Sequence, residues 1–196
     1  DMGNNLFCVI DLQNDFISGS IGSEKAIELA KRIPSFLNIV EESENNYIIF
    51  TKDTHFADTY AETQEGKKLP VLHCVEDEDG WKIPADIYFS NKEPGKCRGK
   101  VVKKNTFGSV EFAGIVEHMI EDYNIDKVFL FGLCTDICVV SNALLLKTIC
   151  PETEIYCISD LSEATSEEAQ KATLKVMNSC QVNIVTSAEV LEMLKE

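Results

Sequence analysis

Short apolar runs alternate along the chain with longer stretches in which apolar residues recur every third or fourth position. A short apolar run that ends in a turn is typical of a buried parallel strand. The first of these, LFCVID at 6–11, ends in an acidic residue and is followed by a polar turn. The pattern predicts strands over 6–11, 47–52, 127–132, 154–159 and 182–185, with weaker candidates at 84–90 and 100–102.

The stretches between these runs carry the helical period, as at Ile27, Ala30, Ile33, Leu37 and Val40. Helices are predicted over 23–44, 109–123, 136–147, 165–179 and 188–195. Alternating strands and helices indicate an α/β fold, with a mostly parallel sheet between two helical layers. The 196 residues suit one domain, 1–196.

Residues 53–84 contain no convincing periodic element. A connection of this length is uncommon in a compact domain and usually has a function. In a parallel sheet, ligands bind outside the carboxyl ends of the strands, so residues that directly follow strands are the first candidates for chemistry.

Charge excludes two classes of partner. Eighteen Lys and Arg against 33 Asp and Glu give a formal charge of −15, whereas nucleic acids and anionic membranes require a cationic surface. No apolar run has the roughly 18–20 residues that a membrane span needs. The N-terminus also lacks a basic region before an apolar stretch, so we expect a cytoplasmic protein that acts on a small molecule.

The eight cysteines are scattered through apolar segments and include no CxxC pair. This distribution favours free thiols in a reducing compartment over a disulfide framework. We expect Cys8, Cys157 and Cys180 to be small core residues.

Three groups follow predicted strands: Asp11, the pair Lys103 and Lys104, and Cys138 at the start of a helix. A helix N-terminus and a nearby cation stabilise a thiolate, and an adjacent carboxylate can move its proton. Each group also has an ordinary alternative, as a capping acid, a solvated lysine or an inert thiol.

A second group lies in the 53–84 loop. Asp53 and His55 follow a strand and share one of its faces because side chains alternate; Glu65 and His73 come later. Two imidazoles with carboxylates can bind zinc, iron or manganese and leave a position open. The alternative is a pair of surface histidines, and the remaining histidine, His118, lies in a predicted helix.

Five segments together resemble one known family: DLQNDF at 11–16, TKDTH at 51–55, LPVLHC at 69–74, KNTFGS at 104–109 and GLCTDICV at 132–139. In this order, from residue 6 to about 160, they resemble the isochorismatase-like cysteine hydrolase superfamily. The Asp-x-His…His loop makes the chain most similar to the nicotinamidase branch. The resemblance implies a flavodoxin-like sheet, homo-oligomers and a metal site in the long loop.

Carried over residue by residue, the resemblance makes Asp11, Lys104 and Cys138 a catalytic triad. Lys104 is preferred over Lys103 because the family lysine precedes an x-x-aromatic segment. Asp53, His55 and His73 match metal ligands, and Glu65 is the expected fourth, with Glu62 as its rival. The implied cofactor is one divalent ion, zinc in the first place, with iron or manganese as alternatives.

The family also implies a cis peptide bond between Leu133 and Cys134. The backbone amides of Cys134 and Cys138 would then form an oxyanion hole. Phe16 and Trp81 are candidates for packing against a substrate ring, or else core residues. The implied reaction converts nicotinamide to nicotinate and ammonia through a cysteine thioester.

Two alternatives stay open at this point. Many nicotinamidases carry an aromatic residue shortly before the second metal histidine, where this chain has KKLPV at 67–71. A metal-independent relative acting on another small amide, or on a carbamoyl or ureido compound, is therefore the first alternative. A non-catalytic metal-binding or redox-sensing protein is the second.

Overall fold

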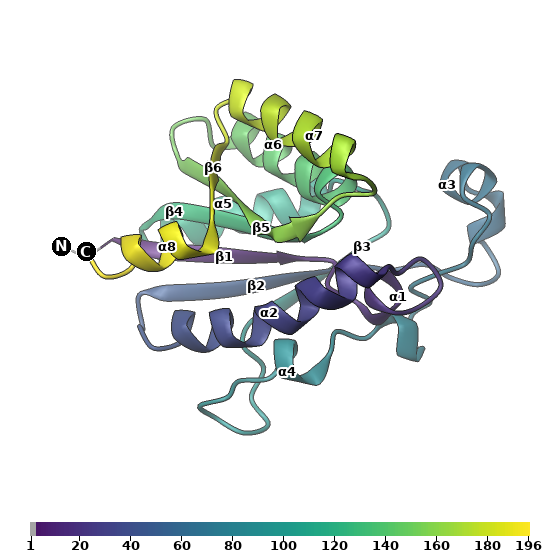
Figure 1. Cartoon of the computed structure of the whole chain (residues 1–196), viewed down its shortest axis with the longest axis horizontal. Helices are drawn as coiled ribbons and strands as arrows, with labels where there is room; N and C mark the ends of the chain where they lie inside the picture. Colours follow the sequence, from purple (N-terminus) through teal and green to yellow (C-terminus); the bar gives the residue numbers. More distant parts are fainter. Residues whose placement is uncertain (1–2) are drawn as a thin grey trace.

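The computed structural model describes residues 3–196, which form one six-stranded sheet between two layers of helices (Figure 1). All neighbouring strands are parallel, in the order β3-β2-β1-β4-β5-β6. The strands are β1 Asn4–Ile10, β2 Asn46–Asp53, β3 Lys100–Lys104, β4 Ile125–Leu133, β5 Glu154–Glu163 and β6 Asn183–Val185. The predicted α/β fold with a central parallel sheet is confirmed.

The helices divide between the two faces of the sheet. Helices α5, α6 and α7 cover one face, and α2, α4 and α8 cover the other (Figure 1). The helices are α1 Asn14–Ile17, α2 Glu24–Val40, α3 Gln64–Lys68, α4 Ala85–Tyr88, α5 Val110–Asp122, α6 Val140–Ile149, α7 Glu167–Ser179 and α8 Ser187–Met193. None of the helices within residues 3–196 is long and apolar enough to cross a membrane.

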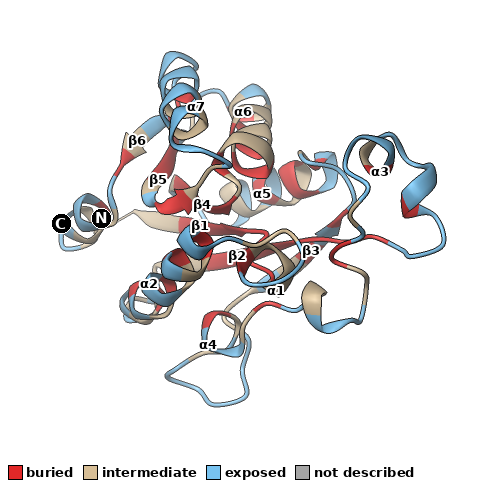
Figure 2. Ribbon diagram, turned by 45° about the vertical axis from the view of Figure 1, so that its right-hand side comes forward, coloured by how far each residue is buried: buried red, intermediate tan, exposed pale blue. Residues whose placement is uncertain are grey.

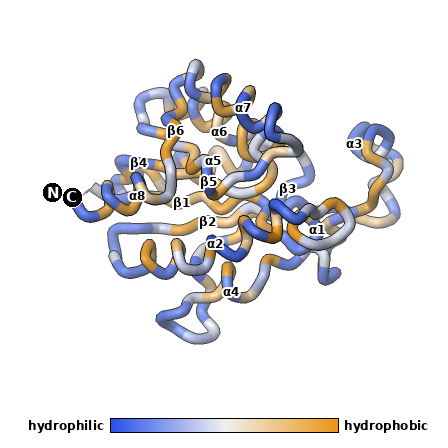
Figure 3. Tube along the Cα trace, viewed as in Figure 1, coloured by the Kyte–Doolittle hydropathy of each residue, from blue (hydrophilic) through white to orange (hydrophobic). Residues whose placement is uncertain are grey.

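Strand alternation produces the two halves of the core. In β1, Phe7 and Val9 belong to the cluster beneath α2, while Cys8 and Ile10 belong to the cluster beneath α5 and α6. The central strands β1 and β4 are therefore buried along most of their length (Figure 2) and strongly hydrophobic (Figure 3), whereas the edge strands β3 and β6 are more exposed. Full burial of one such side chain contributes about 1.5–3 kcal/mol, and this burial holds the strand ends in place.

Two predicted elements differ in the structure. Residues 84–90, predicted as a strand, contain helix α4, which begins after Pro84; the amides of Ile87 and Tyr88 both donate to the Pro84 carbonyl (3.0 Å each), and Ile87 is buried in the core. Helix α2 ends at Val40 and does not continue to 44, since the side-chain amide of Asn46 donates to the Val40 carbonyl (3.0 Å) and caps it.

One of the three cysteines predicted as core residues is exposed. Cys180 follows the end of α7 and is exposed, whereas Cys8 and Cys157 are buried as predicted. The apolar surroundings of Cys180 in the sequence come from Val182, which is itself buried and alternates with its exposed neighbours.

The strand order reverses between β1 and β4, where a parallel α/β sheet usually binds ligands. The two strands approach closely there: Gly132 has φ of 135°, and a Cβ on it would lie 2.1 Å from the Ile10 carbonyl oxygen. Only glycine fits this position. The start of β1 at Asn4 and the C-terminus lie at the opposite end of the sheet (Figure 1).

Candidate active site

Asp11, Lys104 and Cys138 meet at the carboxyl ends of β1, β3 and β4. The Lys104 ammonium lies 2.7 Å from Asp11 Oδ2 and 3.3 Å from Cys138 Sγ. The contact with Asp11 is an ion pair, and the ammonium donates hydrogen bonds to the Cys138 sulfur and to the Thr106 carbonyl (2.9 Å). All three side chains are buried, with Asp11 at 0% and Cys138 at 4% exposed.

Burial and charge together set the protonation of this group. Burial raises the pKa of the Cys138 thiol, and the Asp11 carboxylate raises it further, while the Lys104 ammonium lowers it. Burial likewise raises the pKa of Asp11 against the lowering effect of Lys104. For Lys104, burial favours the neutral amine, but Asp11 and Cys138 outweigh it and raise its pKa, so the lysine is a cation.

The two lysines at the end of β3 face opposite ways. Lys104 points to Asp11 and Cys138, whereas Lys103 is exposed and pairs with Glu76. Strand alternation at the last residues of β3 separates them.

Cys138 lies in a single π turn, Thr135–Val139, which leads from β4 into α6. The peptide bond between Leu133 and Cys134 is cis. The amides of Ile137 and Val139 both donate to the Cys134 carbonyl (3.1 Å each). Among the loop, turn and cap hydrogen bonds of residues 3–196, none is donated by the backbone amide of Cys134 or Cys138.

The second cluster joins Asp53, His55, Glu65 and His73, whose ligand atoms all lie within 4.8 Å of one another. The Nε2 atoms of His55 and His73 lie 2.9 and 3.3 Å from Asp53 Oδ2, and 3.1 and 3.6 Å from Glu65 Oε2. Glu62, the rival of Glu65, is exposed and outside the cluster.

This arrangement fits a divalent ion. With metal–ligand bonds of about 2.1 Å, tetrahedral ligands lie roughly 3.4 Å apart, close to the four distances above. Asp53 Oδ1 and Glu65 Oε2 are buried and lack a hydrogen-bond partner, which an ion would supply. Two imidazoles and two carboxylates suit zinc, iron or manganese.

Without an ion, the cluster shares protons among its members. Burial alone would lower the pKa of His55, but the adjacent carboxylates of Asp53 and Glu65 raise it to about 9. Contacts with His55 and His73 hold the pKa of Asp53 below its usual range despite burial. The His73 ring is oriented by a bond between Nδ1 and the Val71 carbonyl (2.7 Å), as is usual for histidine ligands.

The two clusters adjoin across β2 and β3. Asp53 and Lys104 are register partners, and the Thr54 amide donates to the Lys104 carbonyl (2.7 Å). The end of this strand pair therefore places the four-residue cluster beside the Asp11–Lys104–Cys138 group.

Side chains that the sequence did not single out support both clusters. The Thr51 hydroxyl donates to Asp11 Oδ1 (2.7 Å). The Gln13 amide accepts from the Asp53 amide and donates to the Asp53 carbonyl (both 2.8 Å), replacing a strand partner. Asp15 accepts from the Cys74 amide (2.8 Å) and anchors the loop after His73. In the sequence, the polar residues that follow β1 in DLQNDF were the pattern that could have indicated Gln13 and Asp15.

Aromatic residues surround the histidines unevenly. Tyr60, which the sequence did not single out, packs edge-on against both histidines; its ring centroid lies 4.9 Å from that of His55 and 5.4 Å from that of His73. Phe16 contacts His73 in the same way at 5.6 Å. Trp81 lies elsewhere: the Lys52 ammonium is 3.5 Å from its ring centroid, on the strand face opposite Asp53.

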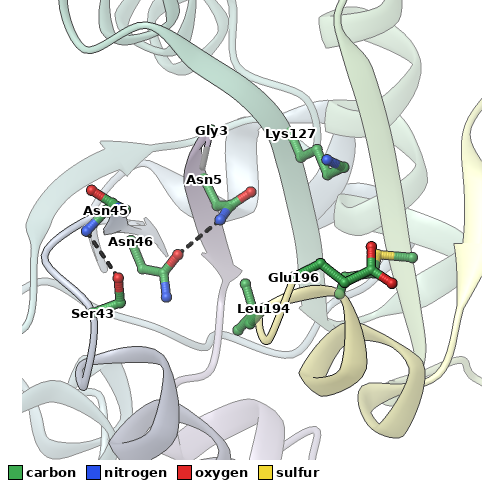
Figure 4. A pocket seen from close by; sticks show the side chains of 9 residues that line it. Gly3, Asn5, Ser43, Asn45, Asn46, Lys127, Leu194 and Glu196 are labelled. Atoms are coloured by element: carbon green, nitrogen blue, oxygen red, sulfur yellow. Dashed lines mark hydrogen bonds between the residues drawn. The ribbon is translucent and has the colours of Figure 1, made fainter. Parts of the chain in front are cut away.

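One pocket borders the candidate site, and another lies at the far end of the sheet. A pocket of about 550 Å³ borders Lys104 and is lined by Thr54, Phe56, Glu76, Lys103, Lys104, Asn105, Thr106, Gly108, Ser109, Val110 and Glu111. A smaller pocket of about 240 Å³ lies at the amino ends of the strands (Figure 4). There the Asn5 amide donates to Asn46 Oδ1 (2.9 Å), and β1 separates the pocket from Asp11 by roughly 20 Å.

Comparison with known families identifies the chain's relatives. The Isochorismatase domain family matches residues 5–189. The chain belongs to this isochorismatase family of hydrolases. A comparison with curated proteins found no match.

Solved structures with this fold come from several branches of the family. Nicotinamidase/pyrazinamidase from Bacillus subtilis is 23% identical, covers 93% of this chain and 99% of its own, and has a TM-score of 0.77. Pyrazinamidase of Pyrococcus horikoshii in complex with zinc is 20% identical, with coverages of 93% and 99% and a TM-score of 0.73. N-carbamoylsarcosine amidase from Thermoplasma acidophilum is 20% identical, with coverages of 94% and 96% and a TM-score of 0.72. These similarities show the isochorismatase-like fold. The substrate of this chain has to be inferred from the residues of its own site.

Proposed function

We propose that this isochorismatase-family protein is a metal-assisted cysteine amidohydrolase that converts nicotinamide to nicotinate and ammonia. The observation that carries the proposal is the juxtaposition of the Asp11–Lys104–Cys138 group with the Asp53, His55, Glu65 and His73 cluster. One cluster supplies a nucleophile with an acid–base partner, and the other supplies a means of holding a ring.

The first half-reaction uses the buried triad. Asp11 accepts the proton of the Cys138 thiol, and the sulfur attacks the amide carbon. The Lys104 ammonium, 3.3 Å from the sulfur, stabilises the thiolate. The backbone amides of Cys134 and Cys138 donate to the tetrahedral oxyanion. Asp11 then returns the proton to the departing nitrogen, so ammonia leaves and a thioester forms on Cys138.

The second half-reaction restores the enzyme. A water molecule gives its proton to Asp11 and attacks the thioester carbon. The carbon–sulfur bond breaks, nicotinate leaves, and the proton returns from Asp11 to the Cys138 sulfur. Lys104 remains an ammonium throughout, since its pKa is raised by the two groups that it contacts. The sum is amide plus water to acid plus ammonia.

Asp53, His55, Glu65 and His73 would hold one divalent ion, zinc in the first place. When bound, the ion supplies a Lewis-acid site for a ring nitrogen and so orients the carboxamide over Cys138. Phe16, whose ring meets His73 edge-on, is proposed as the wall that packs against the substrate ring.

Ammonia release from nicotinamide by the zinc-loaded protein tests the proposal. We expect release that depends on both Cys138 and the ion. The Cys138→Ala variant should lose about 10⁴-fold or more in kcat, because the covalent route requires the thiol. A chelated sample should lose turnover while keeping the thiol reactive.

The outcomes separate the candidate functions. Turnover that survives Cys138→Ala would overturn the nucleophile. Metal-free protein with full activity on a carbamoyl or ureido compound, and none on nicotinamide, would favour the metal-independent alternative. A thiol that pairs reversibly with another cysteine, without any turnover, would favour redox sensing.

A further inference from the structure

Asn142 is a fully buried amide one helical turn beyond Cys138, and it joins two segments of the chain. Its Nδ2 donates to the carbonyls of Cys138 (2.8 Å) and Phe107 (3.0 Å). Its Oδ1 accepts from the Ser109 backbone amide (3.0 Å). All three partners are main-chain groups, so the side chain acts as a bridge between two stretches of backbone.

The segment held by Asn142 is the turn at 105–109, which directly follows Lys104. This turn provides the Thr106 carbonyl, which accepts a hydrogen bond from the Lys104 ammonium. The ammonium donates its other hydrogen bond to the Cys138 sulfur and forms an ion pair with Asp11. The position of the turn therefore sets the direction of the Lys104 head group.

The turn also packs directly on the helix that carries Asn142. A Cβ at Gly108 would lie 3.4 Å from both the Cβ and the carbonyl oxygen of Ser141, so little space separates the two backbones. Ser109 then caps α5 by accepting from the Phe112 amide (3.0 Å), which fixes the far end of the turn. The bonds of Asn142 are the polar ties across this contact.

We propose that Asn142 is a positioning residue that fixes the distance between the Lys104 ammonium and the Cys138 sulfur. The inference rests on the proposed roles of Lys104 and Cys138. Asn142 acts through the backbone on both sides at once: it holds the carbonyl of the nucleophile and the turn that directs the lysine. When it is lost, the cation moves relative to the sulfur and stabilises the thiolate less.

The test is alkylation of Cys138 by iodoacetamide across a pH series, followed at that residue by mass spectrometry, with kcat and KM for nicotinamide measured alongside. Asn142→Leu keeps the approximate volume and removes all three bonds. We expect the midpoint of alkylation to move upward by about one pH unit. We expect kcat to fall about 10²-fold, with KM changed less than about twofold.

Asn46→Leu is the matched control. Asn46 is a half-buried amide that also bridges backbone, donating to Val40, but it lies at the amino ends of the strands (Figure 4). This variant should keep the wild-type midpoint and kcat. If Asn142→Leu matches Asn46→Leu in both readouts, the proposal is overturned.

Asn142→Ser keeps the test decisive if Asn142→Leu does not fold. A helical serine can donate to the carbonyl four residues back, as Ser141 does to Ile137 (2.6 Å). Asn142→Ser therefore retains a tie to Cys138 and loses those to Phe107 and Ser109. The same upward shift is expected, and a wild-type midpoint would contradict the proposal. Alkylation needs no substrate, so this result stands apart from failure of the nicotinamidase assay.

Discussion

The two clusters of the site lie side by side but are built differently. Asp11 and Lys104 come from the ends of β1 and β3, and Cys138 from the turn after β4, so the sheet holds all three backbones. In the cluster of Asp53, His55, Glu65 and His73, which is proposed to bind the metal and is called the metal cluster below, only Asp53 lies on a strand. His55, Glu65 and His73 belong to the long connection after β2, within which His55 and Val75 form an isolated β-bridge.

This difference indicates which cluster should need a bound ion to keep its geometry. A group fixed by buried strands keeps its geometry whether or not a ligand is present, because local opening there requires disruption of the core. A group carried by a surface connection has fewer buried contacts and gains order from what it binds. We therefore expect the triad to remain assembled without metal.

The largest effect on this comparison is expected from Lys104→Met. It removes the cation beside Cys138, so kcat should fall about 10³-fold or more, and Cys138 alkylation should require a higher pH. It also leaves the Asp11 carboxylate buried without its partner, which should lower the free energy of unfolding by about 3–5 kcal/mol at neutral pH. Steady-state kinetics and denaturant unfolding measure the two effects.

The stability loss should depend on pH in a defined direction. Burial raises the pKa of Asp11 above its unfolded value, and loss of Lys104 raises it further. Ionised Asp11 then destabilises the variant above that pKa, and the deficit shrinks as the pH falls and Asp11 takes up a proton. Lys103→Met is the control, since Lys103 is exposed, pairs with Glu76 and lies over the Trp81 ring, away from Asp11 and Cys138. Equal losses in both variants would contradict the assignment of Lys104.

His73→Ala tests whether the triad is independent of the metal cluster. We expect bound metal to fall from about one ion per chain to near zero, with nicotinamide turnover reduced by roughly 10²-fold, because a ligand and its orienting contacts are lost. Cys138 alkylation should keep its wild-type pH dependence. Metal analysis and alkylation rates provide the measurements.

His118→Ala provides the matched control, because His118 is exposed on α5 and its ring bonds only to the Gly114 carbonyl. Its metal content should equal that of the wild type. A changed alkylation profile in His73→Ala would show that the loop cluster also supports the triad.

The strand-end residues were predictable because one rule governs them. Buried parallel strands have a strong apolar signal, and their carboxyl ends meet at one edge, so Asp11, the Lys103–Lys104 pair and Cys138 could be expected to converge. The fold prediction is confirmed on the same basis. The choice of Lys104 over Lys103 came from the resemblance to the family. The error at 84–90 arose where two apolar residues, Ile83 and Ile87, fit either period over a short segment.

The supporting residues could not be predicted because their contacts are long-range. Gln13 bonds to Asp53 across 40 positions, and Asn142 bonds to Phe107 across 35. No local period encodes such a partner. The resemblance to the family supplied the expected ligand set, but Tyr60 and the position of Trp81 depended on how the 53–84 loop folds.

Gln13→Leu should give a smaller effect, confined to the loop cluster. The Gln13 side chain replaces a strand partner for Asp53, and its loss leaves the backbone amide of a metal ligand unpaired. We expect zinc affinity to fall about 10- to 100-fold, as for other groups that orient ligands. Competition with a chelator of known affinity measures it.

Two comparisons make this result specific. Gln64→Leu, an exposed glutamine at the start of α3, should leave zinc affinity unchanged. Cys138 alkylation in metal-free Gln13→Leu should match the wild type, because Gln13 donates no bond to the triad. An upward shift of the alkylation midpoint as large as that expected for Asn142→Leu would show that Gln13 holds the triad in place as well as the metal cluster.

The smallest effect should come from the aromatic residue that packs against the substrate ring. The sequence favoured Phe16 and Trp81 equally for this role, but the structure places them differently. Phe16 meets His73 edge-on, whereas the Trp81 ring packs against Lys52 on the other face of the strands and its Nε1 donates to Thr54 (3.0 Å). An aromatic contact contributes about 1 kcal/mol, so Phe16→Leu should raise KM for nicotinamide roughly fivefold with kcat nearly constant. Trp81→Leu should leave KM unchanged and cost about 0.5–1 kcal/mol of stability through the lost cation–π contact. If Trp81→Leu raises KM instead, the substrate ring binds on the Trp81 face of the strands and not against Phe16. The metal cluster would then orient the ring from the opposite face.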